Sequence, residues 1–261
     1  MTSPAAGDPL EGDPLAGDPA HDISPRGELG VGGGLLRPEG APRWLRPLLA
    51  GMEAVEAEEL SRHRVTAPPD ARRAAVLMLF GEGARGPDVL LGERASTLRD
   101  HAGQVAFPGG GADPGDAGPV DTALREAAEE TGLDPSGVVP LALLPELFIP
   151  PSGFVVTPVL AHWARPSPVR AVDPGETATV ARVPLATLAE PAHRMLVRHS
   201  SGFTGPAFVV SGMLVWGFTG GLLAAVLDRG GWARPWDTTR VADLESAWSA
   251  ARAGHREAAG S

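Results

Sequence analysis

The sequence predicts an α/β (α+β) fold in which helices pack on one mixed β-sheet. Short apolar runs of strand length and segments with helical spacing follow one another without a regular alternation, which argues against a barrel of repeated units. Apolar residues make up 43% of the 261 residues, so the chain can bury a sizeable core.

Helices are expected at residues 44–64, 121–131, 184–188, 219–227 and 241–251. The first segment carries an apolar stripe at helical spacing, and Pro47 lies in its first turn. The second ends before Gly132, a residue type that often follows the last helical turn because it accepts a left-handed backbone. Strands are expected at residues 74–80, 89–93, 104–107, 138–144 and 154–162.

Residues 207–227 hold no charge over 21 positions, a length that fits a membrane span. Ser211-Gly212 lies between two short apolar runs, however, which favours a tight hairpin. Three glycines then interrupt the apolar segment. We therefore expect two buried strands and a core helix here, not a membrane span.

Residues 1–42 are expected to form a disordered Gly/Pro-rich tail. Gly-Asp-Pro recurs at 7–9, 12–14 and 17–19 among few bulky apolar residues. Such a segment cannot bury enough surface to offset its ordering entropy. Residues 43–261 are expected to form a single domain with N-terminal and C-terminal helical extensions.

The composition excludes several classes of function. A formal net charge of -10 predicts no general affinity for nucleic acid or anionic membranes. The chain has no cysteine and no lysine, which excludes disulfides, thiolate metal sites, Schiff bases and a P-loop lysine. No basic region followed by an apolar run stands at the N-terminus, so we expect a cytoplasmic protein without a signal peptide.

Three carboxylates share one face of the helix expected at 121–131. Glu126, Glu129 and Glu130 stand at i, i+3 and i+4, where their charges repel unless a cation lies between them. Mg²⁺ and Mn²⁺ prefer carboxylate oxygens, and Arg125 precedes Glu129 by four residues and can pair with it. Taken alone, the pattern also fits a solvated charged face. A glycine-rich run at 107–111 precedes the helix, and because glycines let backbone approach an ion or a phosphate, it favours a metal site.

These residues resemble the signature of the Nudix hydrolases, whose second half reads Arg-Glu-x-x-Glu-Glu-x-Gly. The matching positions are Arg125, Glu126, Ala127, Glu129, Glu130, Gly132 and Leu133. In the first half, Ala117 stands where the signature has Glu. Asp116 lies one residue earlier and restores an acid if the loop is one residue longer, so its role stays open.

The preceding segment resembles the coenzyme A pyrophosphatase branch of that family. Residues 90–110 contain a Leu-Leu pair, two arginines, a glycine and Phe-Pro-Gly-Gly in the order of the branch motif. The chain reads Gly92-Glu93-Arg94-Ala95 where the branch commonly has Thr-x-Arg-Ser. A loop with two aspartates, as at 113 and 116, is also usual in the branch.

The resemblance implies a Nudix-like mixed β-sheet sandwiched between helices. It also implies metal-dependent hydrolysis of the diphosphate bond of coenzyme A or its thioesters, giving adenosine 3′,5′-bisphosphate and 4′-phosphopantetheine or its acyl derivative. Mg²⁺ or Mn²⁺ is the expected cofactor. Its expected ligands are Gly110, Glu126, Glu129 and Glu130. The expected partner is a small molecule like coenzyme A, with no nucleic acid and no membrane, and a homodimer stays open.

The remaining site residues follow from the same resemblance. Glu126, by its position, is the acid that orients or deprotonates water, with Arg125, Glu129 and Glu130 in the catalytic group. Glu176 is a further candidate for metal or base, and a plain surface-turn acid is its alternative. The expected substrate-binding residues are Arg94, Arg99, Gln104, Phe107, Gly109 and Gly110. For Arg99, a solvated loop position is the alternative, and for Phe107, a role in shaping the turn.

Two other functions stay open at the level of sequence. One is a Nudix enzyme for another nucleoside diphosphate derivative, such as ADP-ribose or a dinucleotide. The other is a binding module that keeps the fold without catalysis. The full set of Glu126, Glu129 and Glu130 argues against the second.

Overall fold

The computed structural model describes residues 34–53, 55–60, 67–98 and 101–259, with the side chains of 254–259 left aside. Most of the predicted tail, residues 1–33, lies outside this range. The predicted tail boundary at residue 42 is wrong, because β1 (Gly34–Leu35) already pairs with β6 (Val138–Leu143) and a 3-10 turn follows at Pro38–Gly40.

The main sheet is mixed, as predicted. In the described residues its order is β1-β6-β8-β2-β3-β4, with β5 also paired to β2, β7 to β8 and β9 to β3. The pair of β2 with β8 is parallel and the other pairs are antiparallel. The bounds are β2 (Arg72–Gly83), β3 (Gly86–Arg94), β4 (Val105–Ala106), β5 (Gly109–Gly111), β7 (Leu147–Ile149), β8 (Phe154–Trp163) and β9 (Thr177–Pro184).

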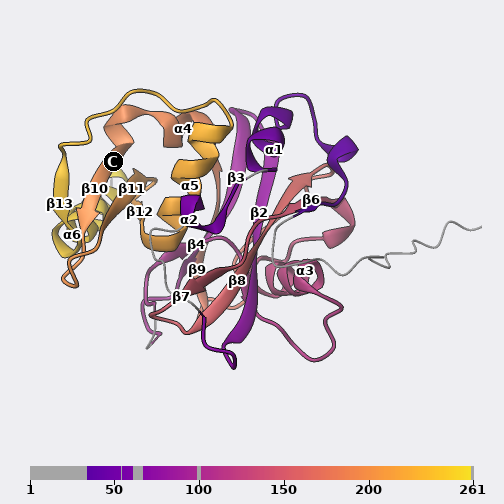
Figure 1. Cartoon of the computed structure of the whole chain (residues 1–261). Helices are drawn as coiled ribbons and strands as arrows, with labels where there is room; N and C mark the ends of the chain where they lie inside the picture. The colour runs from indigo at the N-terminus through magenta and orange to yellow at the C-terminus, as the bar shows by residue number, and fades with distance from the viewer. Residues whose placement is uncertain (1–33, 54, 61–66, 99–100, 260–261) are drawn as a thin grey trace, which may run out of the picture.

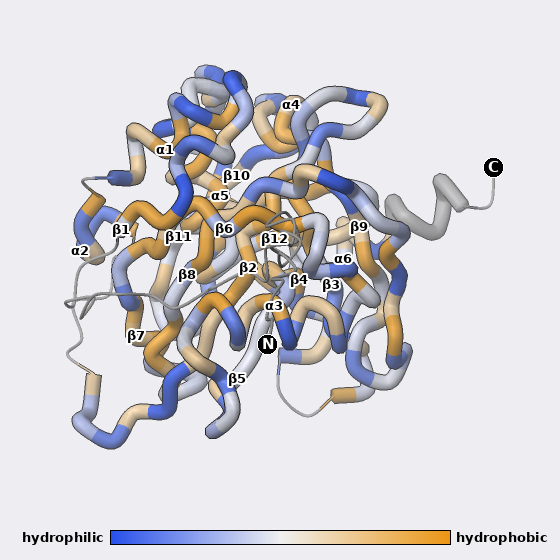
Figure 2. Tube along the Cα trace, turned by 90° about the vertical axis from the view of Figure 1, so that its right-hand side faces the viewer, coloured by the Kyte–Doolittle hydropathy of each residue, from blue (hydrophilic) through white to orange (hydrophobic). Residues whose placement is uncertain are grey.

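Side chains alternate between the two faces of β2, and each face has its own hydrophobic core. Leu77 and Leu79 pack with Ala123 and Ala127 of α3 (Pro119–Thr131). Met78 and Phe80 belong to a larger cluster with residues of helices on the opposite face. Figure 1 shows α3 on one side of β2 and β8 and the other helices toward the far side, so the sheet is sandwiched between helices. In Figure 2, apolar colour runs along β6, β8 and β2 through the middle of the molecule.

The helices on the opposite face come from both ends of the described chain. They are α1 (Arg46–Met52), α2 (Ala57–Leu60), α4 (Leu185–Ala189) and α5 (Gly217–Arg229). The long helix predicted at 44–64 is wrong, since α1 ends at Met52 and α2 begins at Ala57. Gly51 lies where a Cβ would come 2.9 Å from the carbonyl oxygen of Arg229, so α1 and α5 approach each other closely there.

The C-terminal part builds a second sheet, in which the predicted hairpin is joined by two further strands that the sequence did not predict. Its order is β12-β11-β10-β13, and Figure 1 shows it beside the main sheet in orange to yellow. The elements are β10 (Arg194–Arg198), β11 (Thr204–Val210), β12 (Met213–Val215), β13 (Val241–Asp243) and α6 (Leu244–Ala259). A helix predicted from residue 241 therefore begins three residues later, after a strand that pairs in parallel with β10.

The uncharged segment 207–227 forms the predicted hairpin and core helix. Ser211 and Gly212 both have positive φ, 52° and 77°, as a two-residue turn between twisted strands requires. Leu222, Leu223 and Val226 of α5 are fully buried in the larger core cluster. Within the described residues, no helix has the length and apolar character to cross a membrane.

Candidate active site

Helix α3 presents its acidic residues toward the short strand β5. Gly118 and Pro119 begin the helix, and Gly132 ends it with the predicted left-handed backbone, at φ 68°. Ala123 and Ala127 are fully buried against the main sheet. Their burial fixes the rotation of the helix about its axis and thereby sets where its glutamates lie.

Glu130 lies closest to the backbone of the glycine run. Its Oε2 accepts a hydrogen bond from the backbone N–H of Gly109 at 3.1 Å. Its Oε1 lies 3.9 Å from Nη1 of Arg94, a weak ion pair. Burial raises the pKa of the Glu130 carboxyl to about 7, and the charges of Glu126 and Glu176 add to the rise. The unfavourable burial of this charge is what a cation bound nearby would offset.

Glu126 lies one helical turn earlier and faces Gly110. A Cβ on Gly110 would stand 2.5 Å from both carboxylate oxygens of Glu126, so the site leaves no room for a side chain at that position. Burial raises the pKa of Glu126, an effect that Arg125 partly opposes. The glycine therefore lets a backbone strand and a carboxylate come together.

Arg125 holds the loop before α3 onto the helix. Its Nε and Nη2 each donate to Asp116 at 3.0 Å, and Nη2 also donates to the carbonyl oxygen of Gly111 at 2.9 Å. Its Nη1 donates to Glu126 at 3.1 Å and to Glu129 at 3.2 Å, which confirms the predicted contact with Glu129. Arg125 therefore positions Glu126 and the glycine strand.

Asp116 owes its place to this guanidinium. The two hydrogen bonds from Arg125 hold the pKa of the Asp116 carboxyl well below its usual range. Asp116 also accepts hydrogen bonds from the Thr122 hydroxyl at 2.8 Å and from the backbone N–H of Asp113 at 2.9 Å. The sequence left the role of Asp116 open, and in the structure its hydrogen bonds fasten the loop to α3.

The predicted triad of carboxylates is divided in the structure. The side chain of Glu129 is 61% exposed, whereas those of Glu126 and Glu130 are 19% and 18% exposed. Among the residues that the structure describes, no group of three or more His, Asp or Glu side chains is arranged to hold a metal ion. The two partly buried carboxylates at the glycine strand do fit a hard divalent cation in chemistry, since they are oxygen donors whose charge burial disfavours.

Glu176 reaches this region through a loop fastened to the end of α3. The backbone N–H of Val172 donates to the carbonyl oxygen of Glu130 at 3.2 Å, and Ala95 N–H donates to the carbonyl oxygen of Glu176 at 2.8 Å. The Glu176 side chain is exposed, and its charge contributes to the raised pKa of Glu130. The loop thus brings a further carboxylate to the site, as a base or metal ligand requires.

The structure places the predicted substrate-binding side chains in different surroundings. Arg94 lies at the site, where its Nε is buried without a hydrogen-bond partner among the described residues. The side-chain oxygen of Gln104 lies 2.9 Å from Nδ1 of the His101 ring. The backbone carbonyl oxygen of Gln104 accepts a hydrogen bond from the backbone N–H of Arg94. Phe107 is 2% exposed within the larger core cluster, which favours a role in shaping the turn over a contact with substrate. Arg99 lies outside the described residues.

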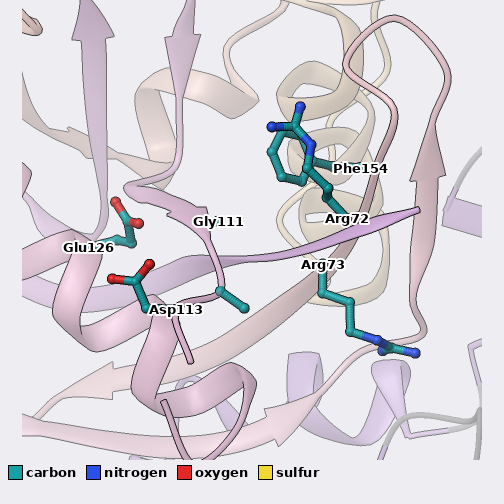
Figure 3. A pocket seen from close by; sticks show the side chains of 7 residues that line it. Arg72, Arg73, Gly111, Asp113, Glu126 and Phe154 are labelled. Carbon is teal, nitrogen blue, oxygen red and sulfur yellow. The ribbon is translucent and has the colours of Figure 1, made fainter. Parts of the chain in front are cut away.

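An open pocket of about 580 Å³ extends from Glu126 to residues that sequence reasoning missed. Figure 3 shows Glu126 and Asp113 along one side of this pocket and Arg72 lying over Phe154 on the other. The Arg72 guanidinium carbon lies 4.1 Å from the centre of the Phe154 ring. The pair Arg72-Arg73 at the start of a strand was the available signal, but two adjacent arginines do not show which one faces a site.

Comparison with known proteins agrees with the resemblance seen in the sequence motifs. The family model of the NUDIX domain matches residues 70–203. An uncharacterized Nudix hydrolase NudL of Cronobacter sakazakii is 44% identical over 115 residues, covering 44% of this chain and 58% of that protein. That of Citrobacter koseri is 48% identical over 89 residues, covering 34% of this chain and 45% of that protein. The chain thus spans less than two thirds of the length of these relatives.

Solved structures with similar backbones superpose on this chain with low TM-scores. A MutT/nudix family protein from Enterococcus faecalis is 17% identical, with a TM-score of 0.40, and the match covers 72% of this chain and 74% of that one. A Nudix hydrolase from M. smegmatis is 27% identical with a TM-score of 0.35, over 46% of this chain and 74% of the other.

Proposed function

The chain belongs to the Nudix family, and we propose that it hydrolyses the diphosphate bond of coenzyme A or its thioesters with the help of Mg²⁺ or Mn²⁺. The observation that carries the proposal is the pair of partly buried carboxylates, Glu126 and Glu130, against the glycine strand. Arg94 and Glu176, at the rim of the same site, support it. The resemblance of residues 90–110 to the coenzyme A branch supports this choice of substrate.

Glu126 and Glu130 would hold the cation, with the Gly110 carbonyl and the exposed Glu129 as further donors. When bound, the ion supplies positive charge to the diphosphate oxygens and makes water more acidic. Arg125 keeps Glu126 in place through its hydrogen bond at 3.1 Å. Arg94 offers a guanidinium to a phosphate oxygen, because its ion pair with Glu130 is long at 3.9 Å.

The reaction is the displacement of one phosphate by water. A water oxygen forms a bond to one phosphorus, and the bond from that phosphorus to the bridging oxygen breaks. Glu126 or Glu176 accepts the proton of the water, and the products are two phosphate monoesters. For coenzyme A these are adenosine 3′,5′-bisphosphate and 4′-phosphopantetheine.

A panel of diphosphates tests the proposal. Coenzyme A, acetyl-coenzyme A, ADP-ribose and a diadenosine polyphosphate are incubated with the full chain and Mg²⁺ or Mn²⁺, and kcat/KM is measured for each. The proposal expects the highest kcat/KM for a coenzyme A species. Cleavage of ADP-ribose or the dinucleotide well above coenzyme A would overturn this choice of substrate while keeping the diphosphatase activity. Absence of metal-dependent hydrolysis of every compound would favour a binding module.

A further inference from the structure

Arg72 is a cation for which the mechanism above has no use. It lies at the first position of β2, opposite the first residue of β8, Phe154, in the parallel pair of these strands. The carbon of its guanidinium lies over the Phe154 ring, 4.1 Å from the ring centre. Such stacking holds a guanidinium in place while leaving its N–H edges free to donate.

The neighbouring arginine differs in both direction and partner. Arg73 forms an ion pair with Glu146, and Figure 3 shows it pointing away from Arg72 and Phe154. Arg72 has no carboxylate partner among the residues that the structure describes. Both arginines line the pocket, but the charge of Arg73 is already paired with Glu146, so Arg72 is the better placed of the two to bind an anion there.

The pocket joins Arg72 to the proposed catalytic centre. Gly110, which faces Glu126, pairs with Ala75 of β2, and Gly111 pairs with Ala74. Arg72 lies three residues along β2 from the level of Glu126, roughly 10 Å at the rise of a strand, and this odd spacing turns its side chain toward the face of the sheet away from α3. The open pocket, which both residues line, therefore passes around Gly111 of β5. Gly111 lies between them, and a Cβ there would stand 3.8 Å from the Phe154 ring. A ligand that reaches from Glu126 across Gly111 arrives at the guanidinium edge of Arg72.

We propose that Arg72, held on the ring of Phe154, binds a phosphate monoester that the substrate carries outside the diphosphate bond being cleaved. A guanidinium donates to two phosphate oxygens at once, which suits it to a dianionic group better than to a sugar or an amide. Resting on the proposed function, the inference identifies this group in coenzyme A as the 3′-phosphate, and it makes Arg72 a determinant of specificity.

The test compares ligands that differ by this one phosphate. With Mg²⁺ present, kcat/KM is measured for coenzyme A and 3′-dephospho-coenzyme A on the wild-type chain, Arg72→Gln and Phe154→Leu. The wild type is expected to favour coenzyme A, and Arg72→Gln is expected to reduce that preference about tenfold or more, mainly through KM. Phe154→Leu is expected to reduce it less, because the guanidinium remains but loses its support. Arg85→Gln, in the exposed turn at the other end of β2, removes the same charge and is the control for net charge.

Binding separates this inference from the proposed function. The affinities of adenosine 3′,5′-bisphosphate and AMP are measured by calorimetry on the same variants, without catalysis. Loss of the bisphosphate's advantage in Arg72→Gln supports the inference even if coenzyme A is not the substrate. If Arg72→Gln weakens both ligands equally, Arg72 acts on the nucleoside and the inference is overturned. It is also overturned if the wild type binds both alike, or if Arg85→Gln has the same effect as Arg72→Gln.

Discussion

Glu130 combines burial with charge, and that combination makes its replacement informative. In Glu130→Gln the amide keeps an oxygen that can accept the hydrogen bond from Gly109 but loses the charge. We predict that metal-dependent hydrolysis falls a hundredfold or more, since charge stabilisation by a held cation contributes several kcal/mol. A variant with undiminished hydrolysis would show that Glu130 holds no metal.

In chelator-treated buffer, the stability of Glu130→Gln relative to the wild type should depend on pH. Burial raises the pKa of Glu130 from 4.5 to about 7, so the folded wild type favours the protonated form. Its stability relative to Glu130→Gln is therefore highest below pH 4.5 and falls as the pH rises to about 7. Above that pH we predict that the variant is the more stable by on the order of 2 kcal/mol. Urea unfolding at pH 5 and pH 8 checks the sign.

Asp116 should act in the opposite direction with pH. The hydrogen bonds from Arg125 lower its pKa, so its contribution to stability is present above its ordinary pKa of 3.8 and is lost as the pH falls below it. We predict that Asp116→Asn lowers the urea midpoint at pH 7 and has a shrinking effect toward pH 3. Asp113→Asn is the matched control, because Asp113 is 67% exposed and lies 3.8 Å from the same guanidinium. Equal effects of the two changes at pH 7 would contradict the role given to Asp116.

For individual residues, a contact could be predicted from the sequence where the two partners lie close together along the chain. The pair of Arg125 with Glu129 follows from four residues of helical spacing, and the structure confirms it. The contact of Arg125 with Asp116 spans nine residues and a loop whose path no periodicity specifies. The burial of Phe107 could not be predicted, because a motif position does not show whether a ring turns into the core or toward a ligand.

At the scale of elements, the glycine strand β5 decides how closely α3 approaches the sheet. Gly110→Ala would place a methyl group against the Glu126 carboxylate, so that side chain must move. We predict a loss of hydrolysis of about a hundredfold, since a displacement of about 1 Å at a reacting group costs that much. Gly115→Ala is the control, because a Cβ there meets nothing within 4 Å. Full activity in Gly110→Ala would contradict the close approach that the site requires.

Elements with a strong local signal were predicted, and those defined by distant partners were not. The hairpin at Ser211 and Gly212 and the end of α3 at Gly132 follow from backbone preferences of single residues. The strand β13 has three residues and exists because β10 lies beside it, so nothing in its own sequence separates it from the helix that follows. The close approach of α5 to α1 at Gly51 is likewise a contact between distant segments, which local spacing does not predict.

For the whole molecule, the two sheets are joined by the larger of the hydrophobic clusters. The larger cluster joins Met78 and Phe80 of the main sheet with Phe208 and Val215 of the second sheet. Composition and apolar patterning predicted the class of fold, because burial of apolar surface requires packed layers. They predicted the hairpin of β11 and β12 but not the strands β10 and β13 that extend this hairpin into a second sheet. That sheet is held by pairings such as β10 with β13, whose partners lie more than forty residues apart.

The central claim is that the chain hydrolyses the diphosphate bond of coenzyme A. The most direct measurement is mass spectrometry of the products formed from coenzyme A and Mg²⁺ in water labelled with heavy oxygen, with Glu130→Gln as the inactive control. The account predicts adenosine 3′,5′-bisphosphate and 4′-phosphopantetheine, with one labelled oxygen in one of the two and none in the other. Release of inorganic phosphate with the diphosphate intact, or no product beyond that of the Glu130→Gln control, would contradict it.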